Sequence, residues 1–238
     1  MKNSLKGKFA VIRSILPTLW FNFHYLPFRQ AVKLPVLLYK PHLYCCDGTI
    51  RFEDGVPIHT GMVRLGFLTE TVYPNSGILW DNRGGEVVFR GPCIIGGNSN
   101  IKVGTYGKLH IGSGLLCTTS LKLVCYDSVV LGDMLRIGWE VTIMDTDFHR
   151  VKTPEGKFLG SAVAPIEVGH NAWLCTQSLI MKGTFIPPYC IVSARSLVKK
   201  RYDVPEYSLL AGSPAMLKKT GLWRDAGDPR TDDMYAVD

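Results

Sequence analysis

Residues 144–150 (MDTDFHR) bring two carboxylates, an imidazole and a guanidinium together where a short apolar run, VTIM, ends. A histidine has an ordinary pKa of about 6.5, so the imidazole of His149 could take a proton from a hydroxyl group near neutral pH. The other interpretation is a solvated loop histidine without a chemical role. The fold around the segment decides between the two.

Downstream of this segment the chain repeats every six residues. Aliphatic side chains stand at this spacing at Val168, Leu174, Ile180, Ile186, Val192 and Val198. Four residues after each of the first five comes a small side chain, namely Ala172, Ser178, Thr184, Cys190 and Ser196. A helix repeats about every 3.6 residues and a strand every two, so neither explains the period. A hexapeptide repeat indicates a parallel β-helix.

The repeat also predicts which side chains form the core. Residues two apart in a strand lie on the same side of it, so each small residue and the aliphatic residue after it point inward. Three strands make one coil of about eighteen residues, and Val168 is expected beside Ile186. The outward positions are mostly apolar: Glu167, Trp173, Leu179, Phe185, Ile191 and Leu197. Outward apolar residues indicate that another subunit, a loop or a ligand covers these faces, and this favours a homo-oligomer.

Upstream, Leu131, Ile137 and Ile143 keep the six-residue spacing, and then the repeat stops until Ile166. The polar stretch FHRVKTPEGKFLGSAVAP fills most of the gap. We therefore expect a loop over residues 145–165 that protrudes from a regular scaffold, with His149 at its base. Loops held on rigid scaffolds are where functional residues concentrate.

The positive charge of the chain lies in its first part. Seven basic residues precede the first acidic one, Asp47: Lys2, Lys6, Lys8, Arg13, Arg29, Lys33 and Lys40. The other 20 basic residues match 20 acidic ones, which leaves the rest neutral and disfavours nucleic-acid binding. The same part is rich in aromatic residues. We expect a partly helical arm over residues 1–46 that contacts an anionic membrane surface or glycan carrier, or packs on its own body or a partner subunit.

The sequence fits membrane-spanning, secreted and disulfide-bonded proteins less well. Residues 9–26 are apolar but contain Arg13 and Pro17, which makes a poor membrane span, and no signal-peptide cleavage pattern follows. The seven cysteines form no C-x-x-C pair, so free buried thiols and a cytoplasmic location are expected. The predicted regions are therefore an arm (1–46), a β-helix domain (47–220) and a polar tail (221–238).

Residues 131–219 resemble the hexapeptide-repeat acyltransferases. The resemblance rests on the repeat, the interrupting histidine loop, the run PIEVGHNAWL and the closing YSLLAGSPAMLKK. The most similar pattern is that of the galactoside, maltose and xenobiotic O-acetyltransferase branch, and the N-terminal half is similar to members encoded with surface-polysaccharide synthesis. The resemblance implies an all-β fold, a left-handed parallel β-helix, and usually a homotrimer with active sites between subunits.

The resemblance also implies an activity, namely transfer of an acetyl group from acetyl-CoA to a hydroxyl of a sugar or glycan, with no metal required. Such a transfer needs a base, a donor that stabilises the oxyanion, and a bound CoA held in line with the acceptor. His149 matches the catalytic histidine of the family. No serine or cysteine nucleophile motif competes, so direct attack is the simpler mechanism. Asp145 and Asp147 are expected to hydrogen-bond the turn or the acceptor rather than to orient the imidazole.

The resemblance assigns further residues to binding. The positions expected to contact CoA are Trp173, Thr176, Ser193, Ala194, Lys199, Lys200 and Lys219. Those expected to contact the acceptor are Trp139, Asp147 and Arg150. Solvation or simple packing is the alternative for each charged or aromatic member. Arg195 and Cys175 stand where the family customarily has glycine, so local contacts there could differ.

Three rival functions stay open. Zinc-dependent carbonic anhydrases share the fold but need three converging imidazoles, for which His110, His149 and His170 are the candidates, and no close pair occurs among them. A non-catalytic β-helix module is a second alternative. N-acylation of an amino sugar is the third, because nothing in the sequence encodes the acceptor.

Overall fold

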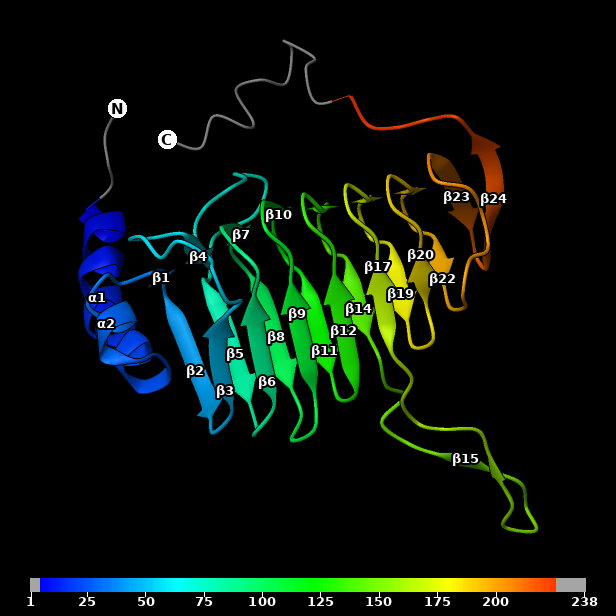
Figure 1. Cartoon of the computed structure of the whole chain (residues 1–238), viewed down its shortest axis with the longest axis horizontal. Coiled ribbons are helices and arrows are strands. Elements are labelled where there is room, and N and C mark those ends of the chain that lie inside the picture. Colours follow the sequence, from blue (N-terminus) through cyan, green and yellow to red (C-terminus); the bar gives the residue numbers. More distant parts are fainter. Residues whose placement is uncertain (1–4, 226–238) are drawn as a thin grey trace.

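The six-residue repeat folds into three parallel sheets that form the faces of a prism (Figure 1). The structure is a computed structural model that describes residues 5–225, and the side chains from residue 13 onward. Most of the polar tail expected over residues 221–238 lies outside the described residues. Each complete coil contributes one strand to each face, so strands that follow one another within a coil lie on different faces and are joined at a corner.

We call the faces 1, 2 and 3 in chain order. Face 1 contains β1 (Val36–Leu38), β4 (Val63–Leu65), β7 (Cys93–Ile95), β10 (Leu115–Cys117), β13 (Arg136–Ile137), β18 (Trp173–Leu174), β21 (Ile191–Val192), β23 (Ser208–Gly212) and β24 (Ala215–Thr220). Face 2 contains β2 (Pro41–Cys46), β5 (Ile78–Asn82), β8 (Ser99–Val103), β11 (Lys122–Cys125), β14 (Thr142–Met144), β19 (Leu179–Met181) and β22 (Leu197–Val198). Face 3 contains β3 (Thr49–Phe52), β6 (Glu86–Phe89), β9 (Lys108–Ile111), β12 (Ser128–Leu131), β17 (Ile166–Val168) and β20 (Phe185–Ile186).

The predicted core columns are confirmed. Val168 pairs with Ile186, and Leu174 pairs with Val192, as the eighteen-residue coil requires. All six aliphatic residues of the repeat and the five small residues between them are buried. At roughly 1.5–3 kcal/mol for each fully buried aliphatic side chain, these columns hold the coils together. The predicted all-β parallel β-helix is therefore confirmed, and the architecture is consistent with the left-handed form.

The corners use left-handed backbone at residues other than glycine. The corner between faces 1 and 2, here the first corner, has Glu140, Gln177 and Arg195 in successive coils at φ of 57°, 60° and 58°. Arg195, which replaces a customary glycine, therefore adopts the same corner conformation as its neighbours. The corner between faces 2 and 3 is the second corner, and that between faces 3 and 1 is the third.

The N-terminal end of the prism is closed by α1 (Leu5–Tyr25) and α2 (Phe28–Ala31), as Figure 1 shows. Three polar side chains of α1, four residues apart, bond the backbone of the first coil. Asn22 accepts from the Val36 N–H (3.1 Å) and donates to the Val36 carbonyl (2.7 Å). Thr18 accepts from the Leu38 N–H (3.2 Å), and Ser14 accepts from the Lys40 N–H (2.9 Å). We call Ser14, Thr18 and Asn22 the polar stripe.

The β-helix begins earlier than predicted. The boundary expected at residue 47 moves to Val36, because Val36 and Leu38 are buried and pair with β4. The arm therefore covers little more than the two helices. Its aromatic residues divide between two environments: Phe21 is buried against Trp80, whereas Trp20, Phe23 and Phe28 are exposed. No helix in the described part of the chain is long and apolar enough to span a membrane.

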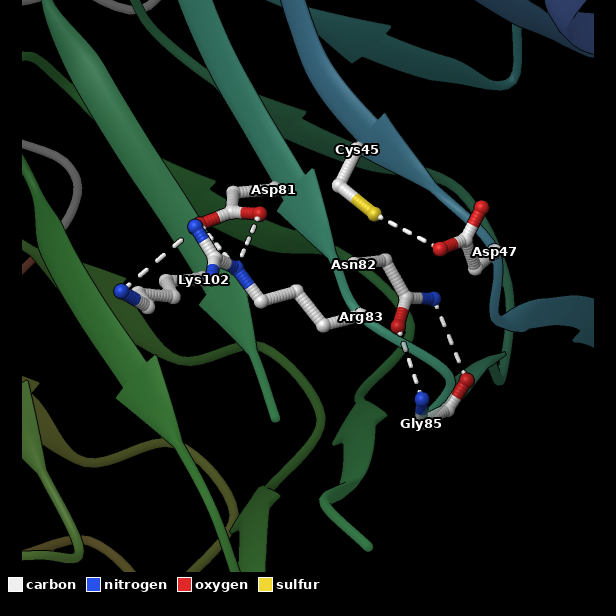
Figure 2. Close-up of polar contacts among 7 residues, drawn as sticks. All are labelled: Cys45, Asp47, Asp81, Asn82, Arg83, Gly85 and Lys102. Atoms are coloured by element: carbon white, nitrogen blue, oxygen red, sulfur yellow. Dashed lines mark hydrogen bonds and ion pairs between the residues drawn. The ribbon is translucent and has the colours of Figure 1, made fainter. Parts of the chain in front are cut away.

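A polar network on face 2 fixes the early coils (Figure 2). The buried carboxylate of Asp81 pairs with Arg83 (2.9 Å) and with Lys102 of the next coil (3.7 Å). At the adjacent second corner, the Asn82 side chain accepts from the Gly85 N–H (2.9 Å) and donates to its carbonyl (3.1 Å), as Figure 2 shows. These pairs lie at the same edge of face 2 as His149, three coils earlier.

The seven cysteines are all free, as predicted, and four are buried: Cys93, Cys117, Cys125 and Cys190. Burial raises the pKa of the Cys117 thiol to about 12. These thiols therefore stay protonated near neutral pH and behave as small core residues.

Candidate active site

Asp145 anchors the base of the segment that interrupts the repeat. This carboxylate is fully buried after β14 and accepts hydrogen bonds from the N–H groups of Tyr126 (2.7 Å) and Asp127 (2.8 Å) of the preceding coil. Burial raises the pKa of Asp145, although the two backbone donors oppose the shift. The Asp145 carbonyl accepts from the Ala164 N–H (3.0 Å), which closes the base of the segment. Asp145 thus bonds the turn, one of the two roles expected of it, and both of its carboxylate oxygens accept from the backbone of the preceding coil.

The predicted loop is a two-stranded hairpin. β15 (Val151–Lys152) pairs antiparallel with β16 (Phe158–Leu159), and Figure 1 shows the hairpin reaching well away from the prism. Its strand residues are exposed, so no other part of residues 5–225 covers them. The Arg150 guanidinium lies 3.5 Å from the centroid of the Phe158 ring. Arg150, a predicted acceptor contact, is therefore stacked on the hairpin in this state.

His149 is exposed at the base of the hairpin. The Phe148 N–H before it donates to the Thr146 hydroxyl (2.8 Å), and the Phe148 ring packs edge-on against Tyr126. The backbone at His149 is therefore held, while the imidazole has no hydrogen-bond partner within residues 5–225. A base in this position is available to a substrate or to a residue of a second copy.

Asp147 is fixed by the next coil. Its carboxylate pairs with the Lys182 ammonium at 2.6 Å, and the same ammonium donates to the Ser161 carbonyl. Lys182 thus links the two ends of the hairpin segment. Sequence reasoning missed it, although the register that pairs Met144 with Met181 would have placed it at this corner.

A second set of predicted residues meets at the first corner, where a cavity of about 220 Å³ opens. Trp139, Trp173, Thr176 and Ala194, all predicted to bind a ligand, line it together with Leu116, Thr118, Arg136, Ile137, Gly138, Cys175 and Arg224. A Cβ on Gly138 would lie 2.8 Å from the Thr176 backbone nitrogen, so glycine is what keeps the wall recessed there. Burial raises the pKa of the Cys175 thiol to about 11, which keeps this lining residue neutral.

One residue beside this cavity comes from far away in the sequence. Tyr73, in the long segment between β4 and β5, donates to the Glu140 carboxylate (2.7 Å) and packs edge-on against Trp139. Gln177 donates to the other oxygen of Glu140 (2.6 Å). The hydrogen bond from Gln177, and then that from Tyr73, lowers the pKa of Glu140. No sequence pattern pointed to Tyr73, because 67 residues separate it from its partner.

The remaining predicted cofactor residues are spread over the C-terminal coils. Ser193 directly precedes the cavity residue Ala194, and its N–H bonds the Leu210 carbonyl (2.9 Å). Lys199 and Lys200 follow β22 at the second corner and are exposed. Lys219 is exposed on β24 of face 1. The structure therefore does not gather these lysines with the cavity residues of the same chain.

The two predicted halves of the site also lie at different corners. Trp139, predicted to contact the acceptor, lies with the predicted CoA residues at the first corner and not with Asp147 and Arg150. It precedes β14 and His149 follows it, so this strand alone separates the two by roughly 10 Å at ~3.3 Å per residue. The cavity and His149 therefore lie at different edges of face 2. Half-buried apolar residues lie on the outer surface of both faces next to the first corner, for example Trp173 on face 1 and Leu179 on face 2.

The three histidines considered for zinc occupy different places. His110 lies on β9 of face 3, and His170 lies at the third corner, where its Nδ1 accepts from the Asp133 N–H (2.9 Å). Across residues 5–225, no three potential metal ligands come together.

Comparison with known proteins identifies two curated relatives. A probable acetyltransferase of Mycobacterium tuberculosis is 26% identical over 115 residues, which cover 48% of this chain and 37% of that protein. The galactoside O-acetyltransferase of Escherichia coli is 29% identical over 113 residues, which cover 46% of this chain and 53% of that protein. The matched parts thus span between about a third and about half of these relatives. No family model matches the chain.

Among solved structures, a polysialic-acid-specific acetyltransferase aligns with 81% of this chain and 76% of its own, at 18% identity and a TM-score of 0.48. The two curated relatives are acetyltransferases, and one represents the galactoside branch. The resemblance to hexapeptide-repeat acyltransferases is therefore confirmed, at low identity.

Proposed function

We propose that the protein is an acyltransferase that moves an acetyl group from acetyl-CoA to a hydroxyl of a sugar or glycan, with surface polysaccharide as the favoured acceptor class. The observation that carries the proposal is the interruption of an otherwise regular β-helix. One buried carboxylate and one ion pair hold the interrupting hairpin so that His149 is presented at its base. The similarity to two acetyltransferases supports the same class.

The first-corner cavity fits the pantetheine arm of CoA. Two indole rings and the recessed Gly138 form apolar walls for this arm, and the Thr176 hydroxyl offers a polar contact there. The exposed Lys199, Lys200 and Lys219 would neutralise the CoA phosphates. When bound, acetyl-CoA supplies an acetyl group that is activated as a thioester.

His149 acts as the general base in this proposal. Its imidazole takes the proton of the acceptor hydroxyl as the oxygen attacks, and it returns the proton to the departing sulfur. The accessible ring suits this role, since no residue of the same chain occupies its nitrogens within the described part. Asp147, Arg150 and Trp139 would contact the acceptor, with Lys182 holding Asp147 in place.

A complete site would then combine two copies of the chain, His149 from one copy and the cavity from its neighbour, in a trimer. Two features support this arrangement: the uncovered hairpin and the half-buried apolar residues of the outer faces. Mixing the inactive variants His149→Ala and Trp173→Ala, with exchange of subunits, should restore part of the activity. Two inactive variants that stay inactive in verified mixed oligomers would contradict the shared site.

The activity itself is tested by thiol release from acetyl-CoA with a panel of sugars. Wild type should show acceptor-dependent release, and His149→Ala should lose about 10²–10⁴-fold, the usual contribution of a general base. His59→Ala serves as the matched control, because this histidine is also exposed. Equal rates for wild type and His149→Ala would refute the assignment.

The same panel separates O- from N-acylation. Hydroxyl sugars should yield ester products that mild alkali hydrolyses, whereas amino sugars would yield alkali-stable amides. Alkali-stable product alone would make the protein an N-acyltransferase. A cytoplasmic location stays a prediction.

A further inference from the structure

The helical cap carries an apolar surface that the rest of the described chain leaves open. The polar stripe fixes one side of α1 to the first coil, so the opposite side faces solvent. Large apolar side chains of α1 and of the segment after it are exposed there: Ile15, Leu16, Trp20, Phe23, Phe28 and Val32. We call these six residues the cap patch. Leu16 and Phe28 are 75% and 72% exposed, and such a cluster on adjacent turns marks an interaction surface.

An apolar groove of about 270 Å³ continues the cap patch between α1 and the first coils. Ile15 belongs to both features, and the other lining residues are Ser14, Thr18, Leu19, Leu34, Leu37, Leu38, Tyr39 and Phe67. Cations lie beside both aromatic rings of the groove. The Lys40 ammonium is 5.4 Å from the Tyr39 centroid, and the Arg64 guanidinium is 5.0 Å from that of Phe67. An apolar slot with a cationic rim matches an acyl chain attached to a phosphate headgroup.

The charge around the cap patch has one sign. Residues 1–46 contain seven basic and no acidic residues, and Arg13, Arg29 and Lys33 are exposed around the two helices. A second copy of the chain would bring the same positive charge to this surface and be repelled. An anionic phospholipid surface supplies both apolar chains and negative charge, and each basic residue near it contributes about 1 kcal/mol.

We propose that the cap binds an anionic phospholipid bilayer, with α1 lying along the surface, the cap patch among the upper acyl segments and the groove taking one acyl chain. Interfacial helices place apolar side chains among the acyl segments while nearby basic residues contact the anionic headgroups; here Arg13, Arg29 and Lys33 supply the basic contacts. Because Figure 1 places the cap at one end of the long axis, the hairpin with His149 stays well clear of the bound end. The proposal goes beyond the proposed function and does not depend on it.

The test is co-sedimentation of the full chain with vesicles of phosphatidylglycerol and with vesicles of phosphatidylcholine. Wild type should bind the anionic vesicles at least about tenfold more tightly than the neutral ones. Raising the salt from about 0.1 M to about 1 M should weaken this binding, because the Debye length falls from ~10 Å to ~3 Å. Leu16→Ser combined with Phe28→Ser, and separately Arg13→Glu combined with Arg29→Glu, should each weaken binding at least about tenfold.

Tyr106→Ser is the matched control, because this aromatic side chain is 85% exposed but lies away from the cap, between β8 and β9. It should bind anionic vesicles like wild type. Circular dichroism of each variant, and thiol release with a soluble acceptor in the absence of vesicles, should match wild type, which keeps this test separate from that of the enzymatic activity.

Three results would overturn the proposal. Wild type that sediments with neither vesicle, or equally with both, would contradict the charge argument. Retained binding in a folded Leu16→Ser, Phe28→Ser double variant would show that the cap patch is not the contact. Loss of oligomer mass in that variant, with no vesicle binding by wild type, would make the cap patch an interface between copies.

Discussion

Two serines in equivalent positions of adjacent coils should respond oppositely to the same substitution. Ser178 and Ser196 both point into the core, both are 1% exposed, and their successors Leu179 and Leu197 pair directly. The Ser196 hydroxyl accepts a hydrogen bond from the Gly212 N–H (3.1 Å), whereas the Ser178 hydroxyl has no partner within the described residues. Ser178→Ala should therefore stabilise the fold, and Ser196→Ala should destabilise it.

The magnitudes follow from hydrogen bonding. Burial of an unpaired hydroxyl costs about 1–3 kcal/mol on protein mutational scales, so its removal at Ser178 should raise the free energy of unfolding by about 1 kcal/mol. Ser196→Ala removes one hydrogen bond and should cost about 0.5–1.5 kcal/mol. For a chain of this size, 1 kcal/mol corresponds to roughly 2–4 °C in Tm. The two variants should thus differ by about 4–8 °C.

The assay is thermal unfolding of both variants and wild type at one protein concentration, since association shifts Tm by mass action. The volume removed is the same in both variants, so a pure packing effect would lower both Tm values equally. Equal losses would refute the argument from the unpaired hydroxyl. A rise for Ser178→Ala together with a fall for Ser196→Ala is the expected outcome.

Further predictions concern the site. Because the folded-state pKa of Asp145 is raised above its unfolded value, the free energy of unfolding should fall as the pH rises from about 4 through the raised pKa. In urea unfolding, Asp145→Asn should make the free energy of unfolding depend less on pH in this range. An unchanged pH dependence would contradict the role of burial. Lys182→Met should release Asp147 and make the hairpin more sensitive to limited proteolysis, whereas Lys157→Met, on the hairpin itself, should not. Gly138→Ala should narrow the first-corner cavity and raise the KM for acetyl-CoA more than it lowers kcat, and unchanged KM would place the cofactor elsewhere.

The regular part of the fold could be predicted because the repeat is short. Adding eighteen residues to a position in this part gives its partner in the next coil. Leu174 and Val192 pair as the eighteen-residue coil requires, and the outward side of each strand follows from parity. The first coils could not be predicted in the same way, because the long segment between β4 and β5 hides the period. Periodicity alone therefore places Val36 in the arm, although this residue opens the first strand.

The site was partly predictable for similar reasons. Trp139, Trp173 and Thr176 share one corner because their positions repeat with the coil, and the structure brings them to one cavity. Tyr73 joins Glu140 through a segment without periodicity, so only three-dimensional packing reveals the contact. The antiparallel pairing of β15 with β16 was also missed, since two-residue strands carry too little alternation to recognise.

The polar stripe of α1 has a consequence for assembly. A stack of parallel strands ends in a row of unpaired backbone groups, which is a template for adding the strand of another molecule. On face 1, Ser14, Thr18 and Asn22 occupy that row at β1. At the other end, β24 reverses direction against β23 and carries Lys218 and Lys219. Both ends of face 1 are therefore closed by the chain itself, which disfavours end-to-end addition of a second copy there and leaves the outer faces as the surfaces open to lateral contact.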